Sequence, residues 1–227
     1  QQIIFDGSVT RLNIIPNYFK GLHSNPDEFR IDINFKDIQK LNFIRENSLR
    51  RGKIIESDKI LEVNASLTLL DQTYKVELSP TGMNLDMIGD PEKYAYKVSV
   101  KNGNRIYGMK EFKLIPPKSR HHLVEWIGHK IEKLEGLVTL RYNFIDVKIN
   151  GDSKGIYAIE EHFNKELIEN NNFREGIIFF LSDDNDIIVY NEKRIINDKV
   201  LNSQLQLLQK KWQAFLNNDL KVEKIFD

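Results

Sequence analysis

The sequence predicts an α+β fold, in which helices pack against an antiparallel sheet. Short runs that alternate apolar and polar residues, typical of half-buried strands, recur along the chain, and polar turn pairs join several of them into hairpins. Stretches with apolar residues at helical spacing lie between the hairpins. Hairpins combined with segregated helices are typical of this fold class. The sequence has no internal repeat and no low-complexity linker, so residues 1–227 are expected to form a single α+β unit.

The composition is that of a globular protein with no general attraction to polyanions. A chain of 227 residues buries roughly two-thirds or more of its unfolded surface. The 33 basic and 33 acidic side chains cancel, which argues against a nucleic-acid partner. The absence of cysteine excludes disulfides, thiolate metal sites and thiol nucleophiles. The sequence contains no apolar run long enough to span a membrane and no recognisable signal peptide.

The first half of the chain is expected to hold one helix and five strands. Residues 30–35 alternate apolar and polar side chains, which suits a strand that follows an N-terminal extension of residues 1–29. A helix is predicted over residues 37–51, and Gly52 is expected to end it because glycine readily adopts the left-handed backbone of a helix C-terminus. The other strands are predicted at residues 61–70, 73–78, 94–101 and 105–115.

Polar turns connect these strands. Asp71 and Gln72 form a polar pair between the second and third strands, which suggests a hairpin. Asn102 and Gly103 suit a type I′ hairpin turn, because both tolerate positive φ. Residues 79–92 are rich in Gly and Asp and are expected to form a loop.

The second half begins with a helix between two breakers. Two prolines end the preceding strand, Ser119 is expected to cap the helix, and Gly136 is expected to stop it. Its apolar residues form one stripe that we expect to be buried: Leu123, Trp126, Ile127, Ile131 and Leu134. The later elements are expected to be a hairpin of residues 142–149 and 156–161, a helix at 164–170, a β pair within 176–190 and a helix at 198–216.

Common enzyme signatures are missing. The sequence lacks GxGxxG, GxxxxGK[ST], HExxH and GxSxG. The five histidines show no metal-ligand spacing, and we expect solvated or capping roles for them, although His122 and His129 would share a helix face. The acidic residues 183–186 are interpreted as a hairpin turn, because a calcium loop would add a glycine at its sixth position and a glutamate at its twelfth. The sequence therefore predicts no metal site.

Particular residues between Tyr96 and Gly176 carry a family resemblance. They form a K-x-S strand, a strand ending in F-x-L, an Arg that opens a helix closing with Gly, and an N-G-x-x-x-G-x-Y-x-x-x-E element. The residues at these positions are Lys97, Ser99, Phe112, Leu114, Arg120, Gly136, Asn150, Gly151, Gly155, Tyr157, Ile159 and Glu161. With them the chain resembles the CotH (spore coat protein H) kinase-like family, over about a third of its length. The family tends to carry an Arg before a Gly in the preceding strand, and the stretch around Gly82 lacks that basic residue.

The resemblance implies an atypical, protein-kinase-like N-lobe, with residues 30–176 as the CotH-like core. It also implies an activity, the transfer of the γ-phosphoryl group of ATP, with Mg²⁺, to Ser or Thr of surface or spore-coat proteins. Kinase N-lobes hold the phosphates with a strand lysine that a helix glutamate orients. Lys97 would be the phosphate-contacting lysine, and Arg120 would bind phosphate together with the N–H groups at its helix start.

Two glutamates complete the implied site. Glu125 would pair with Lys97, although Glu132 on the same helix competes for that role. Glu161 would lie at the hinge beside the adenine; the neighbouring Glu160 should point to the opposite face of its strand, and the family pattern selects Glu161.

The resemblance also places part of the machinery elsewhere. The metal-holding and catalytic-base carboxylates are expected beyond Asp227, so the hairpin and helix of residues 177–227 would lead into a further lobe. The 227 residues would then be the nucleotide-binding half of the enzyme, not expected to complete the reaction alone. The family is often secreted or surface-associated, which favours a location at the cell or spore surface.

Two other functions stay open. A non-catalytic structural or interaction module of a cell or spore surface would account for the missing basic residue near Gly82. A carbohydrate-binding domain would need surface aromatics, whereas Trp126 and Trp212 fall on apolar helical stripes that are typical of a core.

Overall fold

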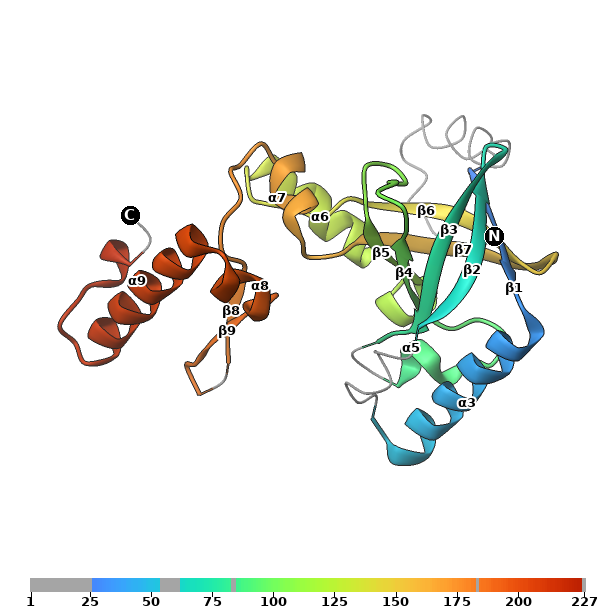
Figure 1. The fold of residues 1–227 in the computed structure, drawn as a ribbon, viewed down its shortest axis with the longest axis horizontal. Helices are drawn as coiled ribbons and strands as arrows, with labels where there is room; N and C mark the ends of the chain where they lie inside the picture. Colours follow the sequence, from blue (N-terminus) through green and yellow to red (C-terminus); the bar gives the residue numbers. More distant parts are fainter. Residues whose placement is uncertain (1–25, 54–61, 83–84, 183, 226–227) are drawn as a thin grey trace, which may run out of the picture.

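A closed barrel of seven strands forms the centre of the molecule (Figure 1). The computed structural model describes residues 26–53, 62–82, 85–182 and 184–225. Around the barrel the strands follow the order β1-β2-β3-β4-β5-β7-β6. Their bounds are β1 Glu28–Ile33, β2 Val63–Leu69, β3 Gln72–Pro80, β4 Tyr96–Val100, β5 Glu111–Ile115, β6 Tyr142–Ile149 and β7 Asp152–Glu161.

The predicted α+β class is confirmed, but the closed barrel corrects the expected kinase-like N-lobe. All neighbouring strands are antiparallel except β1 and β6, which run parallel and close the sheet. The side chain of Asn150, at the end of β6, fixes this closure: its Oδ1 accepts from Ile33 N at 2.7 Å, and its Nδ2 donates to Ile33 O at 2.9 Å. Closure leaves no free edge on the barrel.

The barrel interior is filled by alternate side chains from every strand. Because side chains alternate across a strand, the residues between the inward-facing ones point outward. The inward set includes Phe29, Ile31, Leu67, Val76, Leu78, Val98, Phe112, Leu114, Ile145, Val147, Tyr157 and Ile159.

Two hairpin turns differ from the expected ones by small shifts. Between β2 and β3 the positive-φ pair is Leu70 and Asp71, one residue earlier than predicted. Between β6 and β7 the turn is Asn150-Gly151, shorter than the predicted loop. Gly155, at φ +67°, lies opposite Val147, where the β6–β7 register shifts. This glycine was expected in the loop, but it lies within β7 at an irregularity of the β-bulge type.

The connection between β4 and β5 is only partly as predicted. Asn102 and Gly103 have φ values of 60° and 72°, as the turn prediction requires. A second tight turn at Tyr107 and Gly108 follows directly, so the return strand begins at Glu111 and not at residue 105.

Helix α3 (Phe35–Arg51) lies at one end of the barrel, as Figure 1 shows. Gly52 ends it in the left-handed conformation, as predicted. The helix buries Leu41 and Ile44, and its Arg45 donates to the carbonyl oxygens of Ile88 (2.7 Å) and Gly89 (2.5 Å). These carbonyls belong to a short helix, α5 (Asp86–Gly89), in a segment expected to be loop.

Helix α6 (Val124–Leu134) begins later than predicted and leaves most of its apolar stripe exposed. Ser119 does not cap it, because its hydroxyl donates to Pro116 O at 2.8 Å within a short 3₁₀ turn, η1 (Pro117–Arg120). Trp126 packs against the barrel's outer cluster. The expectation of a buried stripe is wrong for the remaining residues, Leu123, Ile127, Ile131 and Leu134.

The elements that follow β7 extend away from the barrel; in Figure 1, α6 and α7 lie between the barrel and the later hairpin and helices. They comprise α7 (Lys165–Asn170), the hairpin β8 (Phe179–Leu181) and β9 (Ile187–Val189), α8 (Glu192–Asn197), α9 (Lys199–Leu216) and a last 3₁₀ turn, η2 (Val222–Lys224). Asn164 and Asp198 cap α7 and α9 as the predicted starts suggested, whereas α8 was not predicted. Trp212 is buried, as expected for a core residue.

Parts of the sequence predictions fall outside the described residues. These are residues 1–25 of the expected extension, residue 61 of the second predicted strand, residues 83 and 84 of the expected loop, and Asp183 of the acidic turn; the rest of that turn does connect β8 to β9. Residues 28 and 29 of the expected extension already belong to β1. No helix in the described ranges is both long and apolar enough to cross a membrane.

Candidate functional site

A row of polar side chains crosses the outer face of the barrel. Antiparallel pairing places Lys97 on β4 opposite Lys113 on β5, Lys113 opposite Glu160 on β7, and Glu160 opposite Tyr142 on β6. Lys97, Lys113 and Glu160 alternate with core residues on their strands, and Tyr142 is the register partner of Glu160, so the four side chains share the outward face. We call this set, Lys97, Lys113, Glu160 and Tyr142, the polar row.

Both lysines of the polar row have carboxylate partners. Lys113 Nζ lies 2.9 Å from Glu160 Oε1, in a largely buried pair. Lys97 Nζ lies 3.6 Å from Glu62 Oε1 and 3.7 Å from Glu111 Oε1. Lys97, which the family resemblance assigns to phosphate, lies beside a second lysine that the sequence analysis did not single out.

Arg120 and Glu125 join this face from the η1–α6 segment. Arg120 Nη1 donates to Glu125 Oε1 at 2.7 Å. Arg120 ends η1 and does not open α6, so it is not at the exposed N–H groups of a helix start. Glu125 pairs with Arg120 and not with Lys97, and its rival Glu132 contacts His129.

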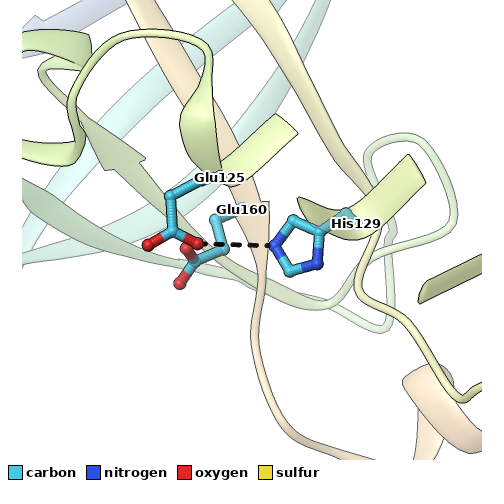
Figure 2. Close-up of side chains that lie close together, drawn as sticks. All are labelled: Glu125, His129 and Glu160. Carbon is cyan, nitrogen blue, oxygen red and sulfur yellow. Dashed lines mark ion pairs between the residues drawn. The ribbon is translucent and has the colours of Figure 1, made fainter. Parts of the chain in front are cut away.

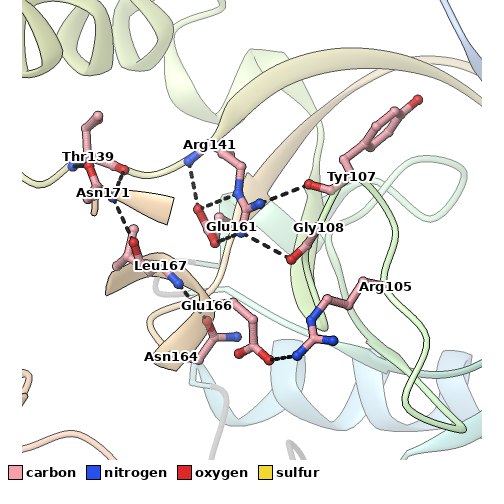
Figure 3. A network of polar contacts seen from close by, with 10 residues as sticks. All are labelled: Arg105, Tyr107, Gly108, Thr139, Arg141, Glu161, Asn164, Glu166, Leu167 and Asn171. Carbon is pink, nitrogen blue, oxygen red and sulfur yellow. Dashed lines mark hydrogen bonds and ion pairs between the residues drawn. The ribbon is translucent and has the colours of Figure 1, made fainter. Parts of the chain in front are cut away.

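Glu161 lies on the opposite side of its strand from Glu160, as alternation predicts. Figure 3 shows its completely buried carboxylate accepting from the backbone N and the Nε of Arg141, both at 3.0 Å, and from Arg141 Nη2. The same guanidinium donates to the carbonyl oxygens of Tyr107 (3.0 Å) and Gly108 (3.4 Å). The structure thus does not bring Glu161 to the polar row, and it ties this side chain to the β4–β5 connection.

A cluster of Glu125, His129 and Glu160 was missed by the sequence analysis. One donor atom from each lies within 4.8 Å of the others, and Figure 2 shows the two carboxylates and the imidazole turned toward one another. Glu125 and His129 are four residues apart on α6, a visible signal, but Glu160 comes from β7. His122 does not share this face as expected, because it precedes α6.

Burial shifts the pKa of two side chains, Tyr142 within the polar row and His162 beside it. Burial raises the pKa of Tyr142 to about 12, helped by the charges of Glu160 and Glu125 and opposed by Arg120. Burial, followed by the charges of Lys113 and Lys97, lowers the pKa of His162 to about 4. His162 is therefore neutral at pH 7, and its Nε2 lies 2.5 Å from the hydroxyl of Tyr190.

A groove of about 1190 Å³ runs alongside these residues, between α6, β6 and α7. Its lining includes His129 and Tyr142, together with the aromatic rings of Trp126, Phe144 and Phe173. The cluster of Glu125, His129 and Glu160 therefore adjoins a space large enough for a small-molecule ligand.

No protein-family model matches the chain, and no curated protein matches it at a significant level.

Proposed function

We propose that the polar row, with Arg120, binds the phosphates of ATP, and that the chain is the nucleotide-binding half of a CotH-like phosphotransferase. Its acceptors would be Ser or Thr residues of surface or spore-coat proteins, and Mg²⁺ would accompany the nucleotide. The observation that carries the proposal is the register of β4 and β5, which places Lys97 and Lys113 side by side on one outward face. Lys97 is also the residue that the family resemblance assigns to phosphate.

The electrostatics of the row suit a multivalent anion. Two ammonium groups on paired strands hold fixed positions, and each is a compact charge suited to phosphate oxygens. Lys113 has one carboxylate partner, Glu160, whereas Lys97 has two, Glu62 and Glu111, at the longer distances of 3.6 and 3.7 Å. A polyphosphate would replace these contacts with several charge-assisted hydrogen bonds.

Thermal unfolding with and without ATP and Mg²⁺ tests the proposal. At a ligand concentration about 100 times Kd, binding stabilises the folded state by about 2.7 kcal/mol. For a chain of this size that corresponds to a rise in Tm of roughly 5–10 °C. Lys97→Ala and Lys113→Ala should each reduce the rise.

Lys148→Ala is the matched control. Lys148 is also a strand lysine paired with a carboxylate, Glu28 at 2.7 Å, but it lies on β6 away from the polar row. It should keep the full ATP-dependent rise. A rise that persists in both the Lys97 and Lys113 variants, or that is absent from the unaltered protein, contradicts the proposal.

A non-catalytic interaction module is the second candidate function. The exposed apolar residues of α6, among them Ile127 and Ile131, favour it, because a contiguous apolar face is typical of a contact surface. This alternative expects no stabilisation by ATP, so the same experiment separates the two.

A further inference from the structure

We propose that Glu125, His129 and Glu160 form a binding site for one divalent transition-metal ion of the Zn²⁺ type. The site shares Glu160 with the polar row, but its argument does not depend on nucleotide binding.

The two helix ligands and the strand ligand converge from different elements. Glu125 and His129 are at positions i and i+4 of α6, so they lie on the same face of the helix. Glu160 is a buried residue of β7 beneath that face, and the three donor atoms lie within 4.8 Å of one another (Figure 2). A zinc ion with bonds of about 2.0–2.2 Å holds its ligands roughly 3–4 Å apart, so small side-chain rotations complete the site.

The imidazole of His129 is oriented as a metal ligand would be. Its Nδ1 lies 2.9 Å from Glu132 Oε2 and 3.3 Å from Thr139 Oγ1. A carboxylate at Nδ1 favours the proton on that nitrogen and leaves the lone pair on Nε2. A histidine that binds a metal through one ring nitrogen usually donates the N–H of the other nitrogen to such a carboxylate. Nε2 is buried, finds no hydrogen-bond partner among the described residues, and lies 3.9 Å from Glu125 Oε2.

Tyr142 supplies an independent second observation. Its side chain belongs to a residue only 9% exposed, and its hydroxyl also has no hydrogen-bond partner within the described part of the chain. Tyr142 is the register partner of Glu160, its ring lies 5.3 Å from that of His129, and both carboxylates of the cluster act on its hydroxyl. A buried hydroxyl without a partner is costly, and a water bound to a metal ion would satisfy it.

The charges and donor types select the class of ion. Arg120 and Lys113 each bond to one oxygen, Oε1, of Glu125 and Glu160 respectively, which leaves each carboxylate a second oxygen for a metal. One imidazole nitrogen with two carboxylate oxygens suits Zn²⁺, whereas Ca²⁺ and Mg²⁺ prefer oxygen ligands alone. His129 and Tyr142 also line the groove, so water and small ligands can reach the remaining coordination positions.

Calorimetric titration of the chelator-treated chain with Zn²⁺, in the absence of nucleotide, tests the site. We expect saturable binding of one ion per chain, lost in His129→Gln and Glu160→Gln and weakened about 10- to 100-fold in Glu132→Gln. His122→Asn, which removes an exposed histidine near α6, should bind as the unaltered protein does. Ca²⁺ should not compete.

X-ray absorption of the Zn²⁺-loaded, unaltered chain gives a readout that does not depend on any variant folding. It should show a single imidazole among oxygen ligands. Absence of one-to-one binding, binding that His129→Gln leaves intact while the variant is folded by circular dichroism, or two imidazoles at the metal overturns the proposal. Such a result would make the cluster a network of polar contacts without a metal.

Discussion

Replacing Arg141 with methionine should destabilise the barrel strongly. The side chain of Glu161 is completely buried, and within the described part of the chain the hydrogen bonds to its carboxylate come from the backbone and side chain of Arg141. Methionine keeps much of the apolar stem but removes the guanidinium, so the carboxylate would retain only the backbone N–H of residue 141. The variant also loses the bonds to Tyr107 O and Gly108 O, which hold the β4–β5 connection.

The expected loss follows from the burial of this ion pair. Removing one partner of a buried pair costs about 3–5 kcal/mol, because the other charge is left uncompensated. The side chain of Arg141 is 26% exposed, so water can approach the abandoned carboxylate and the lower figure applies. A loss of about 3 kcal/mol lowers Tm by roughly 6–12 °C in a chain of this size.

Urea and thermal unfolding, followed by near-ultraviolet circular dichroism, measure the effect. Arg194→Met is the control, since its pair with Glu175 lies at the surface and should contribute about 1 kcal/mol or less. The double variant Arg141→Met, Glu161→Leu should lose less stability than Arg141→Met alone, because no buried charge remains. The reasoning would be refuted if Arg141→Met lost less than about 1 kcal/mol, or if the double variant lost as much stability as Arg141→Met alone or more.

Two further predictions concern a turn and a histidine. Gly108 and Gly103 both have positive φ, so replacing either with alanine should cost about 1–2 kcal/mol of stability. A Cβ at Gly108 would also meet the guanidinium of Arg141, whereas a Cβ at Gly103 would meet open space. Urea unfolding should therefore show the larger loss for Gly108→Ala, and equal losses would contradict this contact. Burial lowers the pKa of His162 from 6.5 to about 4 in the folded chain. As pH falls, the unfolded chain therefore binds a proton on this residue before the folded chain does. The free energy of unfolding should fall by up to roughly 3 kcal/mol between pH 6.5 and pH 4. His162→Gln should flatten this dependence and His122→Asn should preserve it; an unchanged slope in His162→Gln would assign the effect to other groups.

Local signals predicted much of the fold, and long-range pairing was the main omission. The Asn102-Gly103 turn, the Gly52 helix end and the start of the last long helix near Asp198 depend on neighbouring residues, and all three were predicted from the sequence. The parallel contact of β1 with β6 depends on strands far apart in the chain, and an alternating pattern does not specify a strand's partner. This one contact turns an antiparallel sheet into a barrel.

The candidate site shows the same division. Lys97, Arg120 and Glu125 were singled out, and the structure places them on one outer face. Lys113 carries no signal in the sequence that distinguishes it from other strand lysines. The contact of His129 with Glu160 could not be foreseen either, because it depends on how α6 crosses β7.

The two proposals share their carboxylates, and this links them physically. Glu160 and Glu125 now neutralise Lys113 and Arg120, which are cations of the proposed phosphate site. A divalent ion on the same carboxylates would withdraw negative charge from both cations and add two positive charges of its own. If both sites exist, metal and phosphate should therefore strengthen each other's binding, and by thermodynamic linkage the factor must be the same in both directions. The carboxylates that neutralise Lys113 and Arg120 would then be the means by which a bound metal ion strengthens phosphate binding.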